Sequence, residues 1–301
     1  MQPKKEVINM ARETGKFGKL RKIIIGAIEH RYAPYIVGAL ILIFILAPMY
    51  WTVAQAFKPY AEVMQWPPTV FPQAPTLGNF DDVLVTSPIP TYIMNSLIYS
   101  LSTTAFVLVV GSLAAYGLSK YSFPGSGKVS TAFFLTRIIP PIAMILPFFL
   151  IYTQLGLNDT RWSVVLFTIY ICFPLSIWLL KSFFDQFPDE LIESARVDGC
   201  SRLGILWRIV LPVAAPGLAA VSCITFMWTW SSFIGPYLFI NSNAIKPITV
   251  GIYYFVGDEM ILWHQLSAAG ILCAIPGIIF FFIAQKYIIS GLTAGALKGT
   301  V

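Results

Sequence analysis

Charged side chains are scarce in this sequence of 301 residues. Asp, Glu, Lys and Arg together make up 11% of it, against about 25% in an average soluble domain. Hydrophobic residues make up 57%, and they lie in long blocks, not at the spacing of an amphipathic helix. This composition excludes a globular protein whose main solvent is water, so the apolar blocks must face lipid or one another.

Motifs for catalysis and for energy supply are missing. The segment Gly125 to Val129 fails as a nucleotide-binding P-loop, because Ser122 and Val129 stand where the motif needs a glycine and a hydroxyl residue. No HExxH or GxSxG sequence is present, and the four cysteines have no CxxC spacing. We therefore expect a chain that is not an enzyme and that holds no metal, disulfide or cofactor.

Acidic residues are absent from the apolar blocks. An ion-coupled secondary transporter, which is the alternative function, would need such carboxylates or broken helices around an ion site.

Arg137 does lie within a block, at a cost of at least about 2.5 to 3.5 kcal/mol if it were unpaired in lipid. It either lines a pathway, pairs with another helix, or reaches the cytoplasmic end of its span. Pro140 and Pro141 follow it and can kink or hinge this helix.

Six of the blocks are long enough to cross a bilayer, which takes about 20 residues of helix. They cover residues 35–57, 92–119, 129–155, 164–180, 213–240 and 266–289. We interpret the first as a retained span, because no small-residue cleavage site of a signal peptide follows it. The predicted fold class is an all-α integral membrane protein with six transmembrane helices.

Lys and Arg residues predict the orientation, because they gather on the cytoplasmic side of a membrane. Six spans place sixteen of the 20 on the face that carries both termini. The N- and C-termini are therefore expected in the cytoplasm. The expected organisation is a basic tail at 1–33, a transmembrane domain at 34–291 and a C-terminal tail at 292–301. Because the basic residues flank the spans, they predict contact with membrane lipid and not with nucleic acid.

The connection between spans four and five, residues 184–212, has the pattern of a helix, a bend and a second helix. Pro188 and the acidic residues after it suit the first turn of a helix. Gly199 should end that helix in the left-handed conformation, and Ser201 should cap the next one. Pro212 should then open the fifth span.

The first of these two helices has a predicted apolar side formed by Leu191, Ile192 and Ala195. Such a helix either docks on a partner or lies on the membrane surface. The run Glu193-Ser194-Ala195, followed by Asp198-Gly199 and Leu211-Pro212, resembles the EAA motif of ABC importer permeases, with Ser194 in place of an alanine.

This resemblance implies that the loop is a coupling helix seated in a cleft of a cytoplasmic ATPase. The residues it assigns to ATPase coupling are Glu190, Glu193, Ala195, Asp198 and Gly199.

Other segments resemble the carbohydrate importers, in particular permeases like the smaller membrane subunit of the maltose transporter. They include Asn95-Ser96 in the second span, residues 114–125 and residues 286–299. The resemblance implies a permease subunit of a binding-protein-dependent ABC importer that carries a sugar across a bacterial or archaeal cytoplasmic membrane. It implies three partners: a second permease subunit, an ATPase dimer that holds ATP and Mg, and an extracytoplasmic sugar-binding protein.

Aromatic residues near the end of the fifth block are candidates for the substrate pathway, because sugar rings stack on aromatic faces. They are Trp228, Trp230, Phe233 and Tyr237. Aromatic packing or an interfacial belt is the alternative. The chain departs from the family pattern at Trp230-Ser231, where many relatives have a Trp-Asn pair.

Overall fold

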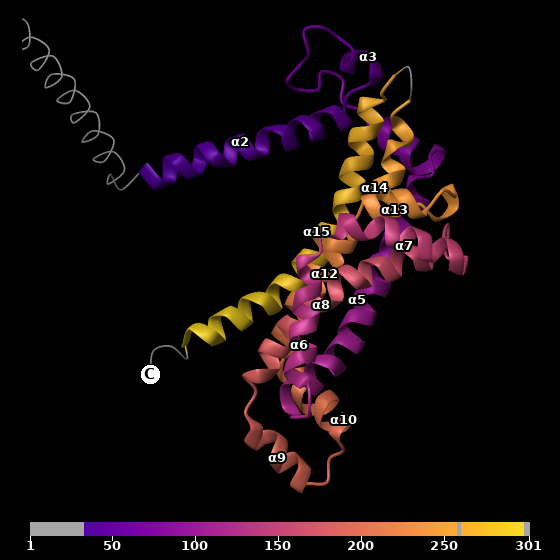
Figure 1. Cartoon of the computed structure of the whole chain (residues 1–301). Helices are drawn as coiled ribbons and strands as arrows, with labels where there is room; N and C mark the ends of the chain where they lie inside the picture. Colours follow the sequence, from indigo (N-terminus) through magenta and orange to yellow (C-terminus); the bar gives the residue numbers. More distant parts are fainter. Residues whose placement is uncertain (1–32, 258–259, 298–301) are drawn as a thin grey trace, which may run out of the picture. The chain divides into compact units, whose positions relative to one another are not determined.

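The computed structural model describes residues 33–257 and 260–297, with side chains through Lys286. The predicted tails therefore fall largely outside the described residues. The chain divides into two units, residues 1–55 and 56–301, which are described separately (Figure 1). The described residues are helical apart from loops, and they contain no strand beyond an isolated bridge between Val256 and Ile261.

Four helices are long and apolar enough to span a membrane without a break. The helix of the first unit, α2, covers Ala33–Ala56. In the second unit these helices are α5 (Ile89–Lys120), α8 (Arg161–Asp185) and α15 (Trp263–Leu297). They agree with the first, second, fourth and sixth predicted spans.

The third predicted span is broken. Helix α6 (Ser126–Leu135) continues into a 3-10 turn, η2 (Thr136–Ile138), and α7 (Pro141–Leu155) leaves at an angle of 99°. A proline disfavours helical geometry in the residue before it, and here Ile139 and Pro140 are both extended. The two consecutive prolines, which predicted a kink or hinge in this span, therefore lie at a sharp break.

The fifth predicted span, 213–240, is also not continuous. Helix α12 (Ala215–Trp230) ends before Ser231, and a separate short helix, α13 (Ile234–Phe239), follows. Pro236 has no N–H to donate to the Ser232 carbonyl, which would be its partner in an unbroken helix. That carbonyl instead accepts a hydrogen bond of 2.6 Å from the Thr249 hydroxyl.

Helices α5 and α8 lie side by side and run in the same direction. Arg161 donates to the Asn95 side chain near their N-terminal ends, and the Thr103 and Thr168 hydroxyl groups are 2.8 Å apart midway. At their C-terminal ends Ser119 donates to Asp185. Because the two helices are parallel, residues 121–160 must cross back once. The bent α6 and α7 pair therefore counts as one span.

The segment after α13 is fastened to the N-terminal ends of this helix pair. The Asn95 amide donates to the carbonyl groups of Ala244 and Lys246, and the Tyr99 hydroxyl donates to that of Ile245 at 2.6 Å. The segment contains η4 (Asn243–Ile245) and leads into α14 (Ile248–Gly251) and η5 (Ile252–Phe255). These contacts fix a loop that the sequence predicted only as a connection.

The connection between the first two predicted spans contains α3 (Tyr60–Val63), α4 (Gly78–Asp81) and the π-helical turn η1 (Asp82–Thr86). Its centre is the Glu62 carboxylate, which accepts hydrogen bonds from the Thr69 hydroxyl at 2.6 Å and from the backbone N–H groups of Gln73 and Ala74. The hydrogen bond from Thr69 is the main cause that lowers the pKa of Glu62 from its ordinary value. The loop is thus ordered by its own residues.

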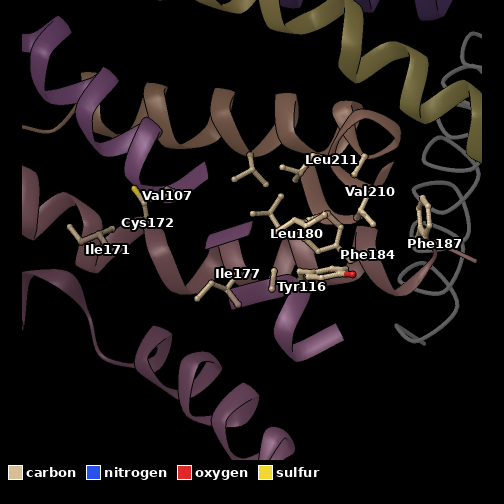
Figure 2. Close-up of a cluster of buried hydrophobic side chains, with 14 of the residues drawn as sticks. Val107, Tyr116, Ile171, Cys172, Ile177, Leu180, Phe184, Phe187, Val210 and Leu211 are labelled. Carbon is tan, nitrogen blue, oxygen red and sulfur yellow. The ribbon is translucent and has the colours of Figure 1, made fainter. Parts of the chain in front are cut away.

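The largest hydrophobic core packs α5 and α8 against the segment that leads into α12. Leu180 and Phe184 of α8 are fully buried there, beside Tyr116 of α5 and near Val210 and Leu211 (Figure 2). A second core joins α12 and α15, where the Phe226 and Phe280 rings stack with centroids 3.9 Å apart.

Gly251 should tolerate no side chain. A methyl group there would overlap the ring of Tyr92, which is itself buried, so we expect Gly251→Ala to destabilise the protein by about 1–3 kcal/mol. Gly117→Ala is the matched control, because a methyl group at Gly117 meets no atom within 4 Å. Thermal unfolding of the detergent-solubilised protein measures both. Equal stability of the two variants would contradict this packing.

Candidate functional site

The connection after α8 forms the helix that the sequence predicted. Helix α9 covers Asp189–Val197, with Pro188 extended just before it and two acidic residues in its first turn. Gly199 has a φ of 81°. The N–H groups of Cys200 and Gly199 donate to the carbonyl groups of Ala195 and Arg196, each at 3.0 Å, which is the Schellman arrangement at a helix end.

The second helix begins where it was predicted. The Ser201 hydroxyl accepts a hydrogen bond from the Gly204 N–H at 3.1 Å, and α10 (Arg202–Ile205), η3 (Leu206–Val210) and α11 (Leu211–Val213) follow as one rod. Pro212 lies inside this rod, so the prediction that it opens the fifth span is wrong. The chain turns by 82° before α12, and Pro216 occupies the first turn there.

One face of α9 is buried within the chain. Ile192 and Ala195 are 3% and 6% exposed, whereas Leu191 is 50% exposed because adjacent residues of a helix point about 100° apart. Ile192 and Ala195 of the predicted apolar side are therefore buried, and Leu191 lies at its exposed edge. Ala195 contributes packing inside this chain, and its role in coupling stays a prediction.

The opposite face of α9 is open. Glu190 and Glu193 are exposed, as are Asp198 and Gly199 beyond the helix end. Val197 is 87% exposed and shares the face of Glu190, since residues seven apart lie one above the other. Sequence reasoning missed Val197, although its spacing from Glu190 was a usable signal. This open surface is acidic with one apolar side chain.

The end of α5 is joined to α9 by polar contacts that sequence reasoning missed. The Lys120 side chain is 6% exposed, and its ammonium group lies 2.7 Å from both the Asp189 carboxylate and the Phe187 carbonyl oxygen. Next to it, the guanidinium groups of Arg196 and Arg202 lie over the Tyr121 ring, at 5.7 and 5.1 Å from its centroid. A force applied to the open face of α9 would therefore reach α5.

A cavity of about 340 Å³ lies where α7, α8 and the end of α12 meet. Trp228 and Phe233 line it, together with Ser231 and Ser232. Tyr237 does not line this cavity but stacks on Phe233, with ring centroids 5.4 Å apart. Three of the four predicted pathway side chains, Trp228, Phe233 and Tyr237, therefore lie at or beside this cavity.

Trp230, the fourth predicted pathway residue, lies in the core. It is 6% exposed and stacks on Phe226 at 5.8 Å. Its placement matches the alternative interpretation, aromatic packing. The role of the other three in the pathway remains a prediction.

Arg137 borders a second, adjacent cavity of about 110 Å³, which Trp228, Tyr170 and Thr136 also line. Its guanidinium donates to the Ile171 carbonyl at 3.2 Å. Ile171 is ten residues from the start of α8, or about 15 Å along the helix axis. Arg137 is exposed on the surface of this chain. Its contact with Ile171 places it level with the middle of α8 and not at the end of its span. Among the side chains described, no group of three His, Cys, Asp or Glu residues could hold a metal ion.

Residues 107–293 match the family model described as "Binding-protein-dependent transport system inner membrane component". The chain belongs to this family. It is an inner-membrane, multi-pass permease subunit of an ABC importer, and it is the transport component without an ATPase domain.

Two permeases illustrate the relationship. The trehalose/maltose transport system permease protein MalG of Thermococcus litoralis is 33% identical over 88% of this chain and 96% of its own. The sulfoquinovosyl glycerol transport system permease protein SmoH of Agrobacterium fabrum is 30% identical over 88% of this chain and 93% of its own. Both are similar along nearly their whole length.

The permease fold is also present in a bacterial ABC transporter involved in the import of the acidic polysaccharide alginate. A chain of that crystal structure superimposes with a TM-score of 0.77 at 22% identity, over 89% of this chain and 97% of that one. The bent spans therefore belong to a known permease fold.

Lys120→Met should cost the permease about 1–3 kcal/mol of stability, because it removes two hydrogen bonds at a buried site and leaves the Phe187 carbonyl without that donor. Lys181→Met is the matched control: Lys181 pairs with Asp185 on an exposed helix surface, where such pairs contribute less than about 1 kcal/mol. Thermal unfolding of the assembled importer compares the two. A larger loss for Lys181→Met would contradict the importance of the Lys120 contacts.

Proposed function

We propose that this permease translocates a sugar, an oligosaccharide or a related carbohydrate, driven by ATP hydrolysis on a separate subunit. Membership of the binding-protein-dependent transport family argues against the alternative, an ion-coupled secondary transporter. The proposed assembly contains a second permease subunit, a cytoplasmic ATPase dimer and an extracytoplasmic sugar-binding protein. ATP and Mg are held by the ATPase and no cofactor by this chain.

The observation that carries the coupling proposal is the form of α9. It is a short helix with an acidic first turn, a glycine-terminated end and an open face formed by Glu190, Glu193 and Val197. Its other face is packed into the core through Ile192 and Ala195. A partner that grips the open face can displace α9 only by moving the core with it, so closure of the ATPase dimer is transmitted to α5 and α8.

The sugar proposal is supported by the names of the relatives, which include a trehalose/maltose permease and a sulfoquinovosyl glycerol permease. It is also supported by the chemistry of the cavity beside α12. Trp228 and Phe233 offer aromatic faces, and Ser231 and Ser232 offer hydroxyl groups. Aromatic faces with a few polar groups suit a ring that carries hydroxyl groups.

Uptake by the reconstituted importer tests the function. We expect labelled saccharide to enter proteoliposomes only when both permeases, the ATPase, the binding protein and ATP are present. Omission of each component in turn is the control. Uptake by this chain alone, driven by a proton or sodium gradient, would contradict the proposal.

Gly199→Asp should leave the importer assembled but break the link between ATP hydrolysis and uptake, because a side chain at a φ of 81° distorts the end of α9 and adds charge to its open face. The ratio of ATP hydrolysed to saccharide transported measures this. Gly156→Asp is the control, since Gly156 also has positive φ and open space around it but ends α7. An equal change of the ratio in both variants would assign the effect to backbone strain alone.

A further inference from the structure

The break in the third span concentrates positive charge beside two adjacent cavities on an exposed side of this chain. Helix α7 begins at Pro141, which borders both cavities, and the N-terminal end of a helix carries a partial positive charge. Arg137 lies four residues earlier, on the far side of the break, and its full positive charge borders the smaller cavity. Two sources of positive potential therefore meet at one place.

This positive charge is not neutralised within the described part of the chain. The ion pairs of Lys120 with Asp189 and of Lys181 with Asp185 do not involve Arg137, and no carboxylate among those residues pairs with it. Its guanidinium makes one hydrogen bond, to the neutral carbonyl of Ile171. A guanidinium has five N–H donors in a planar fork that matches a carboxylate or a similar oxyanion. The other N–H groups of Arg137 make no hydrogen bond to the described residues, and the side chain borders the smaller cavity.

The cavity walls beside Arg137 suit a sugar ring. Trp228 borders both cavities, and Tyr170 and Thr136 border the smaller one. An aromatic face can stack on the apolar face of a pyranose, while a hydroxyl group and the guanidinium can bind its polar edge. The smaller cavity has room for a substituent and the larger one has room for a ring.

We propose that Arg137 and the start of α7 form a cargo subsite for the anionic group of an acidic saccharide, with Trp228 as the surface on which the sugar ring stacks. The subsite rests on the proposed function, because it specifies the charge of the sugar that passes. Discontinuous helices whose N-termini face an anionic group are a recognised way of building such sites inside a membrane. The anionic group is a carboxylate, a sulfonate or a phosphate, which share the oxyanion that the fork binds.

The test uses the complete importer in proteoliposomes with a panel of labelled disaccharides. Each neutral disaccharide is paired with acidic counterparts that carry a carboxylate, a sulfonate or a phosphate. We expect wild-type importer to transport at least one acidic member. Arg137→Gln should raise the KM for it about ten- to hundredfold, as expected for loss of a hydrogen bond to a charged group.

The control variants separate charge from shape. Arg137→Lys keeps the charge but loses the fork, so the KM for the acidic disaccharide should lie between the two values. Trp228→Phe keeps a stacking face and should retain uptake, whereas Trp228→Ala should weaken acidic and neutral members alike. Any neutral disaccharide that is transported should keep its KM in Arg137→Gln.

Three outcomes would overturn the subsite. Transport of neutral disaccharides only would do so, while leaving the sugar-importer function intact. Loss of the second permease from purified Arg137→Gln importer, with equal loss of uptake for every disaccharide, would instead assign Arg137 to an ion pair with that subunit. Failure of every disaccharide to enter would refute the proposed function together with the subsite.

Discussion

Inside a bilayer no water can replace a lost backbone hydrogen bond, and this constraint determines where the helices of this permease can be interrupted. Helices α5 and α8 run without a break, although Pro174 inside α8 has no N–H to donate. Two of the interruptions, after η2 and after α12, lie at the cavities beside Trp228, and a third is the 82° turn before α12. At the interruption after α12, the Ser232 carbonyl finds its donor in the Thr249 hydroxyl. The lost backbone partner at that interruption is thus replaced by a side chain of the same protein.

The features that sequence reasoning predicted correctly are local ones. A span needs only a long apolar run, so the approximate bounds of α2, α5, α8 and α15 follow directly from the hydrophobic blocks. The end of α9 depends on one residue, Gly199, whose lack of a Cβ permits the left-handed backbone. Each of these signals lies within a few neighbouring residues, which is why the order of the amino acids is enough to reveal it.

The features that were missed depend on residues far apart in the sequence. The sequence indicated only that Lys120 is one of many cytoplasmic lysines. In the structure it is buried and contacts Asp189, 69 residues away. Trp228 and Trp230 are two positions apart in the sequence. Trp230 lies in the core because it stacks on Phe226, which in turn stacks on Phe280. Pro140 and Pro141 predicted a kink, yet a break of 99° follows from the packing of α7 against its neighbours as well as from the prolines.

The parallel pair of α5 and α8 is fastened at both ends. At the C-terminal ends Lys120 donates a hydrogen bond to Asp189 of α9. At the N-terminal ends Asn95 and Tyr99 donate to backbone carbonyl groups of the loop around Ile245. Hydrogen-bonded threonines, Thr103 and Thr168, lock the pair midway. Two helices joined in this way move as one rigid unit. A tilt of the pair at one membrane surface therefore also moves its ends at the opposite surface.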